Sequence, residues 1–149
     1  MTADPLTPRD AMIRLLVCGD RDWTVRGPIR ALLQQYDPAT TVLIHGAARG
    51  ADTIAAETAL ELGMQIDRPP LPGRPLGGYP ANWNLYERAA GPIRNTEMLV
   101  EGKPDEVHAF HNDLRRSRGT RDMVHKARRA GIPVTIHTSA DRATPKEQP

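Results

Sequence analysis

Residues 13–23 are IRLLVCGDRDW, an apolar run that ends in a polar loop containing glycine. A short and almost continuously apolar run, here residues 13–18, is typical of a strand that is buried on both faces of a parallel sheet. After the loop, Pro28 is well placed to open a helix over residues 29–36. The segment therefore predicts a strand followed by a helix, which is the repeating unit of α/β folds.

The same alternation continues along the chain. We predict further strands at 41–45, 64–67, 106–110 and 132–136, and further helices at 51–62, 83–89, 91–100 and 119–130. Such an order predicts a Rossmann-like, doubly wound α/β fold: a mostly parallel sheet of about five strands with helices on both faces. In open sheets of this kind, ligands bind at the carboxyl ends of the strands.

We expect one domain over residues 13–137, preceded by a leader at 1–12 and followed by a flexible tail at 138–149. Within the domain, residues 68–80 are RPPLPGRPLGGYP, and this proline and glycine content is incompatible with a regular helix or strand. We predict a long exposed loop there and consider it a candidate lid.

Composition narrows the function classes. The 149 residues are 39% hydrophobic and 26% charged, as in ordinary globular domains. The single cysteine, Cys18, excludes an internal disulfide and a cysteine-based zinc site. We predict no metal and no cofactor, although His108 and His111 lie three residues apart. The chain has no signal core and no apolar run long enough to span a bilayer, so we expect a cytoplasmic protein without a membrane partner.

Two loops between a predicted strand and a predicted helix suit a phosphate group. In HGAARGAD, residues 45–52, Gly46 and Gly50 let the backbone approach a ligand closely, and Arg49 offers a guanidinium to an anion. Asp52 either caps its own helix or holds a ribose hydroxyl, and a purely structural glycine turn is the alternative. In SRGT, the candidate ligand-binding residues are Ser117, Arg118, Gly119 and Thr120. Helix capping alone explains Ser117 and Thr120 but not the surrounding arginines.

Two more segments add candidate ligand-binding residues. In the loop after the first strand these are Gly19, Arg21 and Trp23, of which Trp23 either stacks on a base or pins the loop to the domain. Arg94 and Asn95 fall in the first turn of a predicted helix, where a cation opposes the helix dipole. A cation at this position indicates a specific anionic partner.

These motifs, in this order, resemble the SLOG superfamily, and most closely its YspA/cpYpsA-related branch, over about residues 13–134. The resemblance implies a Rossmann-like fold that binds a nucleotide or a nucleotide-derived molecule similar to NAD or ADP-ribose. It also implies a sensor or effector domain of bacteria or phages, and makes a homodimer an open expectation.

Two related families provide alternatives. Resemblance to the Lonely Guy phosphoribohydrolases implies N-glycosidic hydrolysis, with Arg94 as the catalytic arginine, Asp122 in the place of a catalytic glutamate, and residues 115–120 as the phosphate loop. Glu97 is a second candidate acid. Arg116 and Ser117 replace two glycines of that loop, and Asp122 is one methylene shorter than glutamate. The segment ARGAD, residues 48–52, resembles the DNA-processing protein A family, which implies single-stranded nucleic acid as a less favoured partner of the arginine-rich segment 115–129.

Overall fold

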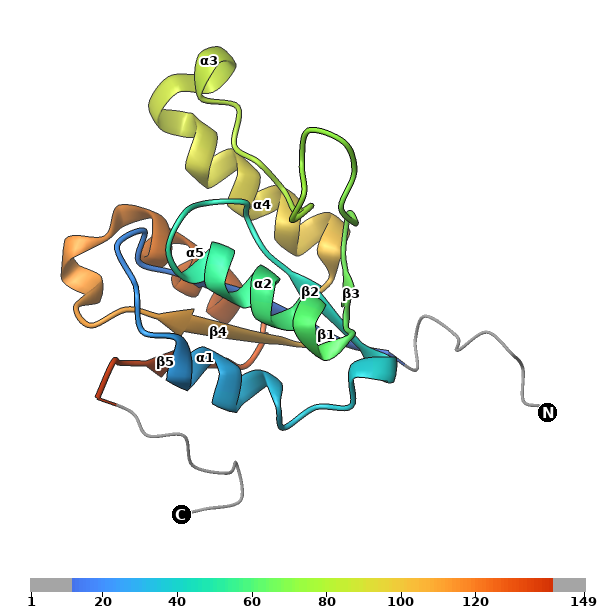
Figure 1. Cartoon of the computed structure of the whole chain (residues 1–149). Helices are drawn as coiled ribbons and strands as arrows, with labels where there is room; N and C mark the ends of the chain where they lie inside the picture. Colours follow the sequence, from blue (N-terminus) through green and yellow to red (C-terminus); the bar gives the residue numbers. More distant parts are fainter. Residues whose placement is uncertain (1–11, 141–149) are drawn as a thin grey trace.

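A parallel sheet of five strands organises the chain (Figure 1). The computed structural model describes residues 12–140. The strands lie side by side in the order β3-β2-β1-β4-β5, and their bounds are β1 Ile13–Gly19, β2 Thr41–Ile44, β3 Gln65–Ile66, β4 Glu106–Phe110 and β5 Val134–His137. All four strand pairings are parallel. The strand order reverses between β1 and β4, which places the preferred ligand position of such sheets at the carboxyl ends of these two strands.

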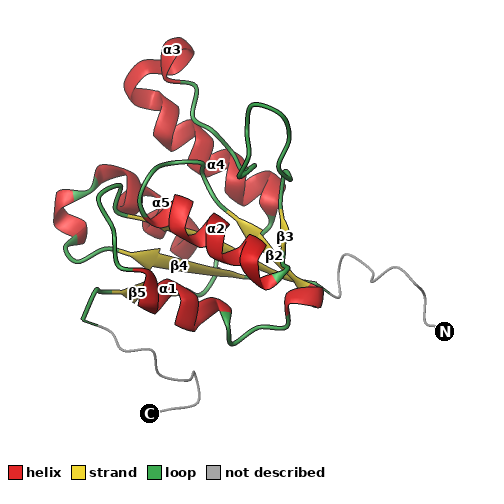
Figure 2. Cartoon of the chain, in the orientation of Figure 1, coloured by secondary structure: helices red, strands yellow, loops and turns green. Residues whose placement is uncertain are grey.

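Helices cover both faces of the sheet (Figure 2). The helices α1 (Arg26–Leu33) and α2 (Ala51–Leu62) pack on one face, and α4 (Ala90–Gly102) and α5 (Arg118–Arg129) pack on the other. The four short helices are η2 Pro38–Thr40, α3 Trp83–Tyr86, η3 Glu87–Ala89 and η4 Leu114–Arg116. The predicted fold class is therefore confirmed.

Strand β1 shows why its residues form a central strand. Leu15 and Val17 point toward α1 and α2, whereas Leu16 and Cys18 point toward α4 and α5. Since successive side chains of a strand point to opposite faces, a strand covered on both sides needs apolar residues at every position. Strand β1 therefore contributes side chains to the apolar core on each face of the sheet.

Several predicted boundaries were wrong. The helix α1 begins at Arg26 rather than at residue 29, because a proline in any position of the first helical turn loses no intrahelical hydrogen bond. The helix predicted at 83–89 divides into α3 and η3 at Glu87, whose φ is +51°. The last strand begins at Val134 rather than at residue 132.

The loop at 68–80 is exposed in its first part only. Residues 69–75 lie in solvent, but Gly77, Gly78 and Tyr79 are buried. Tyr79 N–H donates to the carbonyl oxygen of His45 at 2.9 Å, and Gly78 N–H donates to that of Arg68 at 2.9 Å. The expectation of a wholly exposed loop was wrong, because backbone hydrogen bonds attach its second half to the end of β2.

The predicted leader, apart from Met12, lies outside the described residues, and so does the predicted tail beyond residue 140. Between residues 12 and 140, none of the helices has the length and apolar character needed to cross a bilayer.

Candidate functional site

A cavity of about 620 Å³ lies at the carboxyl edge of the sheet, between the loops after β1, β2 and β4 and the start of α4. This volume is within the usual range for a small-molecule site. We call it the carboxyl-edge cavity, and its lining residues are Cys18, Gly19, Asp20, Arg21, Asp22, Ala48, Arg49, Asp52, Trp83, Arg88, Gly91, Pro92, Arg94, Asn95, Met98, His111, Arg116, Ser117, Arg118, Gly119 and Thr120.

Cationic side chains outnumber anionic ones around the cavity. Six arginines line it, at positions 21, 49, 88, 94, 116 and 118, together with three aspartates, at positions 20, 22 and 52. Within residues 12–140, Arg88, Arg116 and Arg118 make no ion pair and are exposed. A concave surface with an excess of one sign of charge attracts ligands of the opposite sign, so this cavity, with six arginines and three aspartates, favours an anion.

The first turn of α5 opens into the same cavity. Ser117 is its N-cap, and its Oγ accepts a hydrogen bond from Thr120 N–H at 3.2 Å. No acidic side chain lies in this first turn, so the positive end of the helix dipole is not compensated there. A methyl group added at Gly119 would meet no atom within 4 Å. Thr120 N–H and Arg121 N–H donate to Ser117, whereas among the described residues Arg118 N–H and Gly119 N–H have no partner, so these two groups can donate to an anion.

Asp52 shapes the loop between β2 and α2. Its Oδ2 accepts hydrogen bonds from Gly46 N–H at 3.0 Å and from Ala48 N–H at 3.3 Å. Its side chain is almost completely buried, and this burial raises the pKa of Asp52 above its ordinary value. Asp52 therefore closes the loop before α2 but does not cap that helix, whose N-cap Gly50 receives no side-chain hydrogen bond. Its contact with a ribose hydroxyl stays a prediction.

Arg94 crosses from α4 to that loop. Its Nη1 donates to the carbonyl oxygens of Gly46 and of Tyr79, the latter at 3.3 Å, and its Nε donates to Oδ1 of Asn95 at 3.2 Å. Burial lowers the pKa of Arg94, and the nearby Asp52 opposes this shift. Among the described residues, its Nη2 has no hydrogen-bond partner, so one edge of the guanidinium remains for a ligand.

Three predicted ligand residues do not line the cavity. Trp23 is only 4% exposed and packs edge-on against Phe110, so it pins the loop to the domain. Gly50 has a φ of +79°, and a side chain there would overlap the backbone of Asp20 and Arg21. A side chain at Gly46 would overlap the guanidinium of Arg94. These residues shape the site but do not face its interior.

The two candidate acids of the hydrolase hypothesis also lie away from the cavity lining. Asp122 accepts a hydrogen bond from Asn95 Nδ2 at 3.0 Å and forms a salt bridge with Lys126 at 2.9 Å. Glu97 lies farther along α4 and forms a salt bridge with Arg68 at 2.9 Å. The structure therefore does not bring either acid to the cavity beside Arg94.

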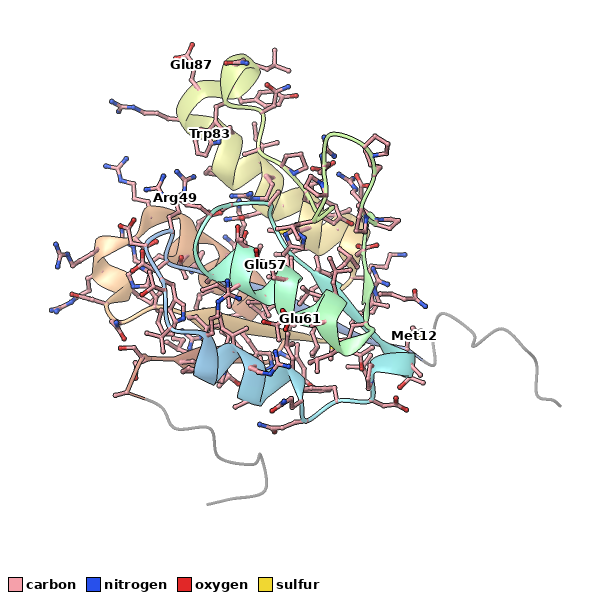
Figure 3. All side chains as sticks on the ribbon, in the orientation of Figure 1. Met12, Arg49, Glu57, Glu61, Trp83 and Glu87 are labelled. Carbon is pink, nitrogen blue, oxygen red and sulfur yellow. The ribbon has the colours of Figure 1, made fainter. Side chains whose placement is uncertain are left out.

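Sequence reasoning missed several lining residues. Trp83 and Arg88 line the cavity, but neither was among the predicted ligand residues, and Arg116 was named only within the phosphate loop of the hydrolase alternative. Figure 3 shows Trp83 on the helical segment at the top of the view, which projects from the rest of the domain. An aromatic residue followed by an arginine five positions later, just before the helix that carries Arg94, was the available signal.

Cys18, near the end of β1, also lines the carboxyl-edge cavity. It is 8% exposed, and burial together with the charge of Asp52 raises the pKa of its thiol. The thiol therefore stays protonated at neutral pH and acts as an apolar wall.

The two spaced histidines have separate surroundings. His108 contacts Glu106 and His137, whereas His111 accepts a hydrogen bond from Asp113 N–H at 3.0 Å. No group of three potential metal ligands occurs within residues 12–140.

The chain has relatives of known sequence. The model of the YspA, cpYpsA-related SLOG family matches residues 13–71, which include β1, β2 and the two loops that follow them. The Gene 61 protein of Mycobacterium phage D29 is 37% identical over 129 residues, covering 83% of this chain and 94% of that protein. The chain belongs to the YspA, cpYpsA-related SLOG family. Membership in this SLOG family suggests a nucleotide-related function and leaves the ligand open.

Among solved structures, DNA processing protein A from Streptococcus pneumoniae is similar, with a TM-score of 0.41 and 16% sequence identity. The similarity covers 85% of this chain and 59% of that protein.

Proposed function

We propose that the carboxyl-edge cavity of this SLOG domain binds the phosphorylated end of a nucleotide or of a nucleotide-derived molecule such as ADP-ribose. The observation that carries the proposal is the first turn of α5, where the Ser117 cap and the open Gly119 position present backbone N–H groups inside a cavity lined by six arginines. Helix N-termini and guanidinium groups together are the usual protein ligands of phosphate.

The arrangement supports binding rather than hydrolysis. Cleavage of an N-glycosidic bond needs a carboxylate that reaches the sugar. Asp122 and Glu97 are held by basic partners outside the cavity lining. Asp52 is inside but is occupied by two backbone N–H groups. We therefore infer that the domain retains its ligand intact and acts as a sensor or effector.

Single-stranded nucleic acid is the second candidate ligand. Arg121, Arg128 and Arg129 are exposed on α5 and, among the described residues, have no acidic partner. Together with the arginines of the cavity rim they extend the cationic surface along the helix. Binding to this surface would weaken steeply with salt, because each neutralised phosphate releases counterions.

The proposal is tested by native mass spectrometry of the freshly purified protein and by thermal denaturation with AMP, NAD and ADP-ribose. A ligand at a hundred times its dissociation constant stabilises the fold by about 2.7 kcal/mol, which corresponds to about 5–10 °C for a domain of this size. Native masses also report whether the chain forms the expected homodimer.

Two variants of α5 make the test specific. Arg118 lines the cavity and Arg121 does not, although both are exposed arginines on the same helix. Arg118→Ala should weaken nucleotide binding while Arg121→Ala leaves it unchanged. Release of free base from the bound nucleotide would identify a hydrolase instead. Failure of every nucleotide to bind, with tight salt-dependent binding of an oligonucleotide, would establish the second candidate.

A further inference from the structure

Trp83 occupies the rim of the carboxyl-edge cavity and is 46% exposed. Two neighbours lie beside its ring. A methyl group added at Gly91 would come to ordinary contact distance, 3.6 Å, from the indole, so the ring lies near the start of α4. The guanidinium carbon of Arg21 lies 5.0 Å from the ring centroid, which is a cation–π contact.

We propose that Trp83 is the platform on which the aromatic base of the ligand stacks, and that it sets the preference of the cavity for base-containing phosphates. This inference rests on the proposed function. Phosphate-binding groups cluster at the first turn of α5 and at Arg94, whereas Trp83 comes from the segment before α4. A nucleotide has the matching asymmetry, with an anionic end and a flat aromatic end.

The other exposed apolar residues of the same short helix do not share this position. Leu85 is 64% exposed and Tyr86 is 44% exposed, yet neither lines the carboxyl-edge cavity. A general docking role for α3 would involve all three side chains alike. Of the three, Trp83 alone lines the cavity, and every nucleobase has a π face that can stack on an indole. The exposed Arg21 guanidinium lies over one face of this ring, so a base that stacks on that face takes the place of the guanidinium.

Calorimetric titration of wild type and Trp83→Ala with AMP and with ribose 5-phosphate tests the inference. The two probes share the sugar phosphate and differ by the base. Loss of base stacking should weaken AMP binding by about 5-fold to 150-fold and leave ribose 5-phosphate binding unchanged. Trp83→Phe should keep most of the AMP affinity, and Tyr86→Ala is the matched control from the same helix. Because Trp83 is half exposed, its replacement should leave the melting temperature near that of wild type.

Tryptophan fluorescence gives an independent readout, since the sequence contains Trp23 and Trp83 alone. AMP should quench the emission of wild type but not of Trp83→Phe, in which only the buried Trp23 remains. An equal loss of affinity for both probes in Trp83→Ala, or no loss for either, would overturn the stacking role and leave the proposed function intact. If wild type binds neither probe nor any other nucleotide, the proposed function fails and the stacking role fails with it.

Discussion

Replacing Gly119 with alanine should change stability and ligand binding in opposite directions. Gly119 is the second residue of α5, its φ is not positive, and the added methyl group would meet no protein atom within 4 Å. Alanine is more favourable than glycine in a helix by up to about 1 kcal/mol. The melting temperature of the free protein should therefore rise by up to about 2–4 °C.

The same methyl group would lie in the carboxyl-edge cavity, where the proposed phosphate approaches the N–H groups of α5. Loss of one charge-assisted hydrogen bond costs about 1.5–3 kcal/mol, which is roughly a 10-fold to 150-fold weaker affinity. Thermal denaturation without ligand and calorimetric titration with AMP measure the two effects separately in one variant.

Gly27→Ala is the matched control. Gly27 is the second residue of α1, its side-chain position is also open, and it lies away from the cavity. Its gain in stability should be smaller, because Pro28 restricts the residue that precedes it, and its AMP affinity should equal that of wild type. Unchanged AMP affinity in Gly119→Ala, despite the expected gain in stability, would refute the phosphate site at α5.

Three further outcomes follow from the packing. Because the pKa of Asp52 is raised, the folded protein binds the proton of this carboxyl more tightly than the unfolded chain does. The contribution of Asp52 to the free energy of unfolding should therefore fall as the pH rises above about 3.9, the pKa of an unperturbed aspartate. Urea denaturation between pH 3.5 and 7 should show a shallower fall in Asp52→Asn than in wild type. Gly78→Ala should lower the free energy of unfolding by about 2–4 kcal/mol, because the φ of Gly78 is +93° and the added methyl group would overlap the ring of His45. Gly63→Ala should lose only the part that comes from the positive φ, because Gly63 has a φ of +87° but open space around its side-chain position. Equal denaturation midpoints of the two variants would contradict the predicted overlap with His45. The buried Cys18 thiol, with its raised pKa, should react slowly with iodoacetamide at pH 8 until urea unfolds the domain; rapid alkylation of the folded protein would show that the cavity wall is open.

The sequence was most informative where a local pattern determines the structure. The almost continuous apolar run at residues 13–18 identified β1, because a strand covered by helices on both faces is built mainly from apolar residues. Helix α2 was predicted at its exact bounds since Gly63, in the left-handed conformation with a φ of +87°, ends it. Most of the predicted ligand residues line one cavity, as expected for loops at one edge of a parallel sheet.

Long-range packing could not be predicted in this way. For Trp23 the sequence left base stacking and pinning of the loop open, and the structure packs it against Phe110, whereas Trp83, which had no predicted ligand role, lines the cavity. Nothing near either residue in the sequence reveals which of them meets a core side chain from β4. Asp122 is likewise one turn into α5, as a catalytic acid would be, but its orientation depends on Asn95 from another helix.

The overlap of Gly46 and Arg94 has an evolutionary consequence. The guanidinium occupies the space that a side chain at position 46 would need, and it donates to the carbonyl oxygen of the same residue. In a relative that has lost the arginine at position 94, a side chain at position 46 would no longer meet the guanidinium. In a relative that has gained a side chain at position 46, the arginine would be displaced from its present place. The two positions, 48 residues apart in the chain, should therefore be inherited as a pair, and their covariation across phage and bacterial relatives would show whether this packing of the proposed anion site is maintained.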